Sequence, residues 1–159
     1  MTGDLLHYED FHVGDVKTHG PFAMSAELIR EFAREWDPQP FHLDEELARS
    51  SVLGGLCASG WQVCAIMNRL MVDGYASHAA GLGSFGIREV KWMKPVYADD
   101  ELTLRYTVLD ARVSSSKPEM GIVTMCWEAI DQHGTVKTEM TGVNLFRVRN
   151  PAQTQATAS

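Results

Sequence analysis

Residues 59–73 carry large apolar side chains at helical spacing, and this segment limits the folds that the chain can adopt. A helix is predicted from Ser59 to about Asp73, with Gly74 in the position that directly follows a helix. So many apolar positions indicate that the helix is buried on most sides and that its methionines belong to the core. These positions are Trp61, Val63, Cys64, Ala65, Ile66, Met67, Leu70, Met71 and Val72.

After this helix the pattern changes from helical to strand-like. Residues 102–108 alternate apolar and polar side chains, which is typical of a strand with one buried face. Residues 85–93, 122–130 and 136–148 are rich in β-branched and aromatic side chains and are separated by turn-forming residues. The sequence therefore predicts four strands in an antiparallel meander.

The part of the chain before the long helix is more mixed. Residues 16–24 are expected to be extended, and Ser25 is expected to cap a helix that ends beside Asp37. Asp44 is expected to cap a second short helix that ends near Arg49. One strand before the long helix and four after it are best accommodated by a curved antiparallel sheet wrapped around that helix, which is the hot-dog arrangement of the α+β class.

The bulk composition limits the partners of such a domain. The chain has 159 residues, a formal net charge of −7 and a pI near 5.3, which argue against a nucleic-acid or anionic-membrane surface. A single domain is expected over residues 1–149, and residues 150–159, which lack large apolar side chains, are expected to be disordered. The N-terminus lacks the basic start and apolar run of a signal peptide, so we expect a cytoplasmic protein.

The turn between Asp37 and His42 is the candidate site of chemistry. It places a carboxylate and an imidazole five positions apart, and Pro38 and Pro40 lie between them. Each proline fixes its own φ and favours an extended conformation in the residue before it, so the turn is predicted to be stiff and non-helical. Alone, either side chain is also consistent with an ordinary turn residue. A stiff carboxylate–imidazole pair is suited to acid–base catalysis.

Ser59 and Gly60 follow at the predicted start of the buried helix. Free backbone N–H groups at a helix start carry partial positive charge, and a glycine allows a ligand to approach them closely. Such a position fits an oxyanion hole, although a glycine there is also consistent with close packing alone. A carboxylate, an imidazole and an anion site together form a candidate catalytic set.

These residues resemble the MaoC-like family of (R)-specific enoyl-CoA hydratases and acyl dehydratases. The resemblance covers residues 8–149, and the matching motif positions are Asp37, Pro40, Phe41, His42 and Gly60. Two positions depart from the family pattern, because Gln39 replaces an asparagine and Ser59 replaces the usual histidine before the glycine. Neither departure removes a catalytic group, but both alter the edge of the site.

The resemblance implies a hydro-lyase that acts on an acyl-CoA thioester in fatty acid metabolism. It implies that Asp37 and His42 exchange protons with the substrate through one water, with either residue as the base, and that the Gly60 N–H binds the thioester oxygen. Gln39, Ser59 and Phe41 are expected to contact the substrate. No metal or redox cofactor is expected, and coenzyme A enters only as part of the substrate. The family usually forms dimers, so a homodimer or higher homo-oligomer is expected, with the site at the interface.

Several other interpretations are open from the sequence. A thioesterase or a non-catalytic acyl-thioester binding module on the same fold is consistent with the pattern. Arg88, Lys91 and Lys94 are candidates for contacts to coenzyme A phosphates, but solvated charges on a strand explain them equally well. Packing is favoured over nucleophilic catalysis for Cys57 and Cys64, because neither has a histidine nearby in the sequence.

Two further motifs are rejected. The glycine motif at residues 81–86 opens a strand rather than a helix, which argues against a dinucleotide site. No metal site is predicted either, because His7, His12 and His19 lack the spacing of metal ligands.

Overall fold

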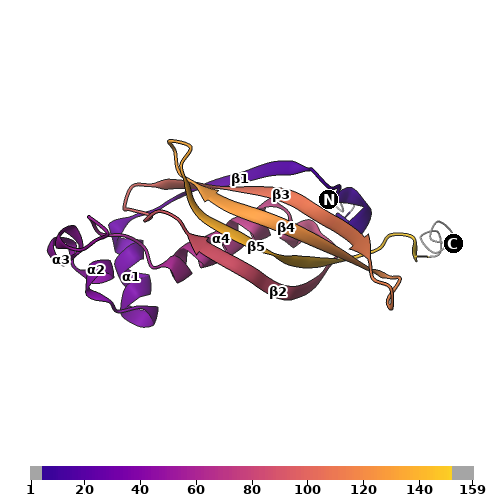
Figure 1. The fold of residues 1–159 in the computed structure, drawn as a ribbon, viewed down its shortest axis with the longest axis horizontal. Coiled ribbons are helices and arrows are strands. Elements are labelled where there is room, and N and C mark those ends of the chain that lie inside the picture. The colour runs from indigo at the N-terminus through magenta and orange to yellow at the C-terminus, as the bar shows by residue number, and fades with distance from the viewer. Residues whose placement is uncertain (1–4, 152–159) are drawn as a thin grey trace.

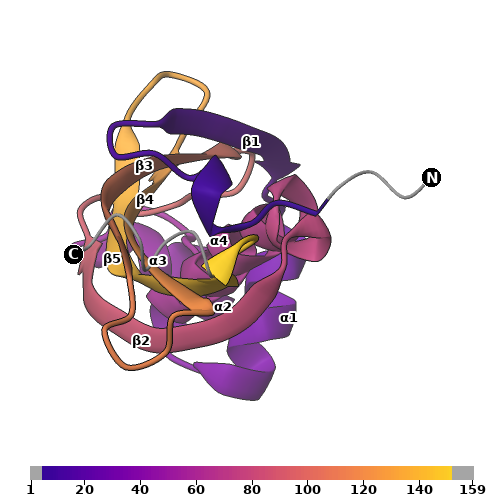
Figure 2. The ribbon, with the colours of Figure 1, turned by 90° about the vertical axis from the view of Figure 1, so that its right-hand side faces the viewer.

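The computed structural model describes residues 5–151. Within them, five strands form one antiparallel sheet that curls around α4, and α1, α2 and α3 gather at one end of it (Figures 1 and 2). The elements are β1 (Val16–Ala23), α1 (Ala26–Trp36), α2 (Pro40–Leu43), α3 (Glu45–Ser50), α4 (Gly60–Gly74), β2 (Gly81–Trp92), β3 (Glu101–Val113), β4 (Met120–Ile130) and β5 (Val136–Arg147), with short 3-10 turns η1 (Tyr8–Asp10) and η2 (Ala76–His78). The predicted α+β hot-dog fold, a sheet wrapped around a long helix, is confirmed.

The strand order is β1-β3-β4-β5-β2. The three strands β3, β4 and β5 form the predicted meander, but the prediction that β2 continues it was wrong. Because β3 already pairs with β1 and β4, β2 lies instead at the far edge of the sheet, where Ile87 pairs with Gly142 of β5. The segment after β2 must therefore cross the end of the sheet to reach β3, and this crossing segment lines the cavity described below.

The helix α4 is buried on one face rather than on most sides. Met67 is fully buried, Met71 is nearly so, and both belong to the core as predicted. On the opposite face, Trp61 is 63% exposed and Val72 is 38% exposed. The expectation of burial on most sides was wrong for the single chain, because the sheet covers only one side of the helix.

The end of α4 also differs from the prediction. Gly74 is the last residue of the helix rather than the residue after it, and its φ is not positive. The glycine is required by space, because a Cβ on Gly74 would lie 2.2 Å from the ring of His19 on β1. The ring of His19 in turn stacks on Tyr106 at a centroid distance of 5.8 Å.

The turn that carries His42 is partly helical, which corrects the predicted non-helical loop. Pro40 occupies the first turn of α2, where its missing N–H costs nothing and its fixed φ suits a helix. The predicted cap residues on either side are confirmed, because Ser25 accepts a hydrogen bond from the Leu28 N–H and Asp44 accepts from two N–H groups of α3. The turn remains short and firmly anchored at both ends.

The structure also bears on the cysteines, on membrane-spanning helices, on groups of potential metal ligands and on the extent of the tail. Cys57, Cys64 and Cys126 are free thiols. No helix in residues 5–151 is long and apolar enough to cross a membrane, and the same residues contain no group of three potential metal ligands. Residues 152–159 of the predicted disordered tail lie outside the described residues.

Candidate active site

A cavity of about 840 Å³ opens where the N-terminal end of α4 meets α2 and the segment that follows β2. All six predicted site residues line it, although they come from two separate parts of the sequence, residues 37–42 and 59–60. Its lining is Asp37, Gln39, Phe41, His42, Ser51, Val52, Leu53, Cys57, Ala58, Ser59, Gly60, Trp61, Val63, Trp92, Met93, Lys94, Pro95, Val96 and Thr138. The cavity is mostly apolar, and three of its polar side chains, Gln39, His42 and Ser59, lie next to Asp37.

Asp37 and His42 face each other inside this cavity. Asp37 is the C-cap of α1 and His42 lies on α2, so the two short helices hold the two side chains. The distance from His42 Nε2 to Asp37 Oδ2 is 3.4 Å, and the side chains are 7% and 17% exposed. This separation is longer than a normal hydrogen bond and leaves the pair accessible to a small polar group.

The protonation of His42 follows from its second contact. Its Nδ1 lies 2.7 Å from the backbone carbonyl of Cys57. A carbonyl oxygen can only accept a hydrogen bond, so His42 Nδ1 carries a hydrogen and donates a hydrogen bond to the Cys57 carbonyl. In the neutral imidazole, Nε2 is therefore an acceptor that faces the carboxylate of Asp37. Two acceptors facing each other are suited to holding a water by both of its hydrogens.

The carboxylate of Asp37 is held by two further donors. Gln39 Nε2 donates to Asp37 Oδ1 over 2.7 Å, and the Ser59 hydroxyl also donates to the carboxylate. Burial alone would raise the pKa of Asp37, but the hydrogen bonds from Ser59 and Gln39 and the nearby His42 lower it below the ordinary value. Asp37 is thus an ionised acceptor at neutral pH.

The start of α4 brings a backbone donor to the same cavity. Ser59 is fully buried as the N-cap, and its hydroxyl oxygen accepts a 3.3 Å hydrogen bond from the Trp61 N–H. The preceding N–H, of Gly60, has no acceptor among residues 5–151. An unpaired N–H at the positive end of a 15-residue helix can bind a partial negative charge.

Gly60 is also needed for packing. A Cβ at this position would lie 2.5 Å from the indole of Trp92, which covers the helix start. Trp92 meets Trp61 edge-to-face at a centroid distance of 5.2 Å. The packing role and the donor role of Gly60 are therefore compatible, and the geometry favours both.

Comparison with known proteins identifies the family. The family model described as "MaoC like domain" matches residues 11–126. The chain belongs to the MaoC-like family. The resemblance inferred from the Asp37 to Gly60 motif is thus confirmed at the level of the family.

Three proteins are similar to this MaoC-like chain over most of its length. A crystal structure of a MaoC-like dehydratase from Rhodospirillum rubrum is 40% identical, with a TM-score of 0.84, over 91% of this chain and 98% of that one. The uncharacterised protein YdeM of Bacillus subtilis is 34% identical over 128 residues, which are 80% of this chain and 89% of YdeM. A mesaconyl-CoA hydratase of Haloarcula marismortui is 29% identical over 96% of this chain, which spans only 37% of the length of that relative.

The MaoC-like fold brings a thiol close to the pair, which the sequence did not predict. Cys57 Sγ lies 3.9 Å from His42 Nδ1. That nitrogen is already bonded to the Cys57 carbonyl, and burial raises the pKa of the Cys57 thiol. A protonated, buried thiol is a poor nucleophile, which favours packing as the role of Cys57.

Of the three candidate cations in this MaoC-like protein, Arg88 is exposed and does not line the cavity, and the other two have different surroundings. Lys94 lines the cavity at its exposed side. Lys91 is paired with Glu89 and Glu139 over 3.0 and 3.3 Å, so its charge is already balanced. Lys94 is therefore the better candidate for contact with an anionic part of a ligand.

Sequence reasoning missed the other side of the cavity. Trp92, Thr138 and Val96 come from β2, β5 and the crossing segment after β2, and nothing in their local sequence marks them as site residues. The contact made by the Cys57 carbonyl was also not predicted, because every residue type has the same backbone carbonyl. Only the fold could reveal these contributions.

Proposed function

We propose that this protein interconverts a 2-enoyl thioester and a 3-hydroxyacyl thioester by adding or removing water. The observation that carries the proposal is the pair of facing acceptors, Asp37 Oδ2 and His42 Nε2, 3.4 Å apart in a mostly apolar cavity. An apolar cavity accommodates an acyl chain, and the acceptor pair provides the polar point at which water is held. Membership of the MaoC-like family supports the same reaction class.

In the hydration direction, a water donates hydrogen bonds to Asp37 and His42 and attacks C3 of the enoyl group. One of the two residues takes a proton from the water, and a proton returns to C2 from the pair. The double bond becomes an enolate during the attack, and the unpaired Gly60 N–H stabilises the negative charge on the thioester oxygen. Dehydration runs through the same steps in reverse.

The remaining polar groups position the reactants. Gln39 and Ser59 hold the Asp37 carboxylate in its ionised form and lie where the thioester enters. Phe41 packs edge-on against the His42 ring at a centroid distance of 4.7 Å and presents its other side to the acyl chain. This mechanism uses no metal or redox cofactor.

Coenzyme A is the proposed carrier of the acyl group. One relative is a mesaconyl-CoA hydratase, which acts on a coenzyme A thioester by its name. Lys94, an exposed cation in the cavity lining, is the proposed contact for a phosphate of such a carrier.

We also propose that two copies associate through β2 and the exposed face of α4, which carries Trp61 and Val72. β2 is an edge strand of 12 residues, and exposed apolar side chains lie along it, including Phe85 (67% exposed) and Ile87 (48% exposed). An apolar edge of this length is a surface that natural proteins cover. In an antiparallel pairing of two β2 strands, the start of one strand lies beside Trp92 of the other, so the partner would close the exposed side of the cavity.

The assembly is tested with the double variant Phe85→Lys/Ile87→Lys. We expect it to sediment as a monomer while the wild type sediments as a dimer or larger assembly. Val13→Lys is the matched control, because Val13 is 63% exposed and lies outside β2 and α4. A double variant that sediments like the wild type would rule out this interface.

The activity is tested by incubating the protein with 2-enoyl-CoA thioesters of several chain lengths. Loss of the conjugated absorbance without release of free thiol is the expected result. Release of thiol would instead support the thioesterase that the fold also permits. Binding of the thioesters without either change would support an acyl-thioester binding module and contradict the proposed reaction.

A further inference from the structure

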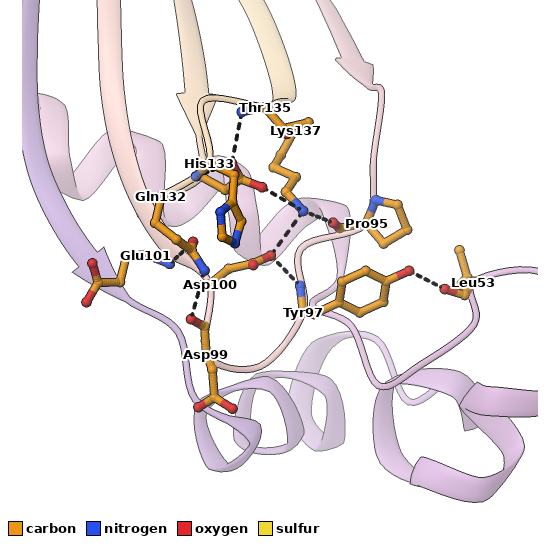
Figure 3. Close-up of polar contacts among 11 residues, drawn as sticks. Leu53, Pro95, Tyr97, Asp99, Asp100, Glu101, Gln132, His133, Thr135 and Lys137 are labelled. Carbon is orange, nitrogen blue, oxygen red and sulfur yellow. Dashed lines mark hydrogen bonds and ion pairs between the residues drawn. The ribbon is translucent and has the colours of Figure 1, made fainter.

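A buried cluster of charges lies around Lys137 (Figure 3), next to Pro95, which lines the cavity. The side chain of Lys137 on β5 is only 9% exposed, and its Nζ lies 3.2 Å from Asp100 Oδ2 and 3.3 Å from Asp131 Oδ2. The same Nζ donates to the backbone carbonyl of Pro95 over 3.1 Å. The ammonium group is therefore surrounded by three acceptors and is closed off from water.

Burial of three charges is costly, and stability alone is weak grounds for it. Well-packed apolar side chains of similar volume often stabilise a protein as much as a buried ion pair does. Buried charges with satisfied hydrogen bonds can instead fix one arrangement of the segments that they join. The question is which segments Lys137 joins.

Lys137 holds the crossing segment, residues 93–97, at several points. Its carbonyl accepts hydrogen bonds from the Met93 and Lys94 N–H groups over 2.9 and 3.0 Å. Its ammonium group binds the Pro95 carbonyl and lies 5.5 Å from the centre of the Tyr97 ring. Both ends of this segment are thereby fixed to β5.

The crossing segment in turn holds residues 53–58. The Ala58 N–H donates to the Val96 carbonyl over 2.8 Å, and Cys57 forms a β-bridge with Tyr97. The Tyr97 hydroxyl donates to the Leu53 carbonyl over 2.5 Å, as Figure 3 shows. The backbone around Cys57 is thus attached to the segment that Lys137 fixes.

The last link in this series of contacts is His42. The Cys57 carbonyl accepts the Nδ1–H of His42 over 2.7 Å and so sets the direction in which Nε2 points. A shift of residues 95–97 would move this carbonyl and turn the imidazole away from Asp37. The contacts therefore run without a gap from Lys137 to the acceptor pair.

We propose that Lys137, with Asp100 and Asp131, is a positioning residue that holds His42 in its reactive orientation through the Cys57 carbonyl. Only the expected change in reaction rate rests on the proposed function. The effect of Lys137 on the orientation of His42 can be measured in the protein without substrate.

The test compares Lys137→Met with the matched control Arg105→Met. Arg105 forms a two-bond ion pair with Glu128, at 2.7 and 3.0 Å, and it does not line the cavity. With 2-enoyl-CoA as substrate, we expect kcat to fall about 10- to 100-fold in Lys137→Met with KM nearly unchanged, because small displacements of a catalytic group cost this much. Arg105→Met should keep both values.

The second measurement is the NMR signal of the His42 Nδ1–H in the free protein. We expect the signal to shift or broaden in Lys137→Met and to stay unchanged in Arg105→Met. If Lys137→Met does not fold, Tyr97→Phe replaces it, because it removes only the hydroxyl bonded to Leu53, and a smaller change in the same direction is expected.

The outcomes separate the two proposals. A wild type that converts no enoyl thioester contradicts the proposed function, and the NMR signal then decides the role of Lys137 alone. A folded Lys137→Met, or Tyr97→Phe in its place, that keeps the wild-type His42 signal overturns the positioning role, whatever its activity. A changed signal in Lys137→Met, or in Tyr97→Phe in its place, together with an unchanged signal in Arg105→Met supports it.

Discussion

Two clusters, each with carboxylate and basic side chains, lie on either side of the cavity wall, and they differ in how completely their groups are paired. Asp37 and His42 face each other across 3.4 Å and open on the cavity. Lys137 is bound by Asp100, Asp131 and the Pro95 carbonyl and does not reach the cavity. The first cluster has a free acceptor on each side, and the second has no free position on its ammonium group.

The difference shows how similar side chains acquire different roles. A free acceptor can take a proton from a ligand. Replacing any contact of a fully paired buried group instead lowers the stability of the folded protein. The Asp37–His42 pair, called the exposed pair below because its free acceptors face the cavity, is thus suited to chemistry, and the buried Lys137 cluster is suited to holding structure. Changes in the first should alter rate with little effect on stability, and changes in the second should alter stability and, through the orientation of His42, also rate.

The largest effect is expected from replacing either member of the exposed pair. Asp37→Asn and His42→Gln should each lower kcat by ~10²–10⁴-fold, because each removes a group that exchanges protons with the substrate. The melting temperature should change little, since both side chains border the cavity. Steady-state kinetics with 2-enoyl-CoA and thermal unfolding measure the two quantities. Undiminished turnover in either variant would contradict the acid–base assignment.

The exposed pair could be predicted from the sequence because its parts are close together in the chain. Asp37 and His42 lie within one turn, and Gly60 follows at the start of a helix that its apolar pattern reveals. Helix caps and prolines act on neighbouring residues, so the local conformation that they set can be predicted without the tertiary fold. The meander of β3, β4 and β5 was predictable for the same reason.

The buried cluster could not be predicted in this way. Lys137 lies on β5, whereas Pro95 and Asp100 lie in the connection between β2 and β3, and β2 joins the sheet at an edge that strand patterns do not specify. The carbonyl of Cys57 is a backbone group, so its contact with His42 depends on the path of the chain alone. The exposed face of α4 also could not be predicted, because apolar residues at helical spacing do not show which elements cover them.

A smaller effect, on stability, is expected from Asp131→Asn. It should lower the free energy of unfolding by about 1–3 kcal/mol, because the buried Lys137 loses one of its two carboxylates. Asp99→Asn is the matched control, since Asp99 is exposed and has no ion pair within residues 5–151. Chemical denaturation at neutral pH measures both variants. Equal stability of the two would show that the cluster does not behave as a closed ion-pair group.

The same residue predicts a pH dependence of stability. Burial raises the pKa of Asp131, but hydrogen bonds from the Thr135 and His133 N–H groups and the charge of Lys137 lower it overall. A lowered folded-state pKa contributes stability above the ordinary Asp value of 3.8, and this stability is lost as the pH falls through the folded-state pKa. The wild type should therefore lose more stability than Asp131→Asn in this acid range.

The smallest effect is expected at the edge of the exposed pair, in Gln39→Leu. Gln39 donates to Asp37 Oδ1 and helps to lower the pKa of that carboxyl, so its loss should raise the pKa of Asp37 toward the ordinary value. Because the proposed reaction needs the ionised carboxylate, the acid limb of the kcat/KM profile should move to higher pH, with little change in rate near neutral pH. Gln132→Leu, which removes a glutamine that contacts Asp99 and Glu101 instead, should leave the limb in place. An unmoved limb in Gln39→Leu would mean that the Ser59 hydroxyl and His42 are sufficient to keep Asp37 ionised, and that the exposed pair is more completely held than its geometry indicates.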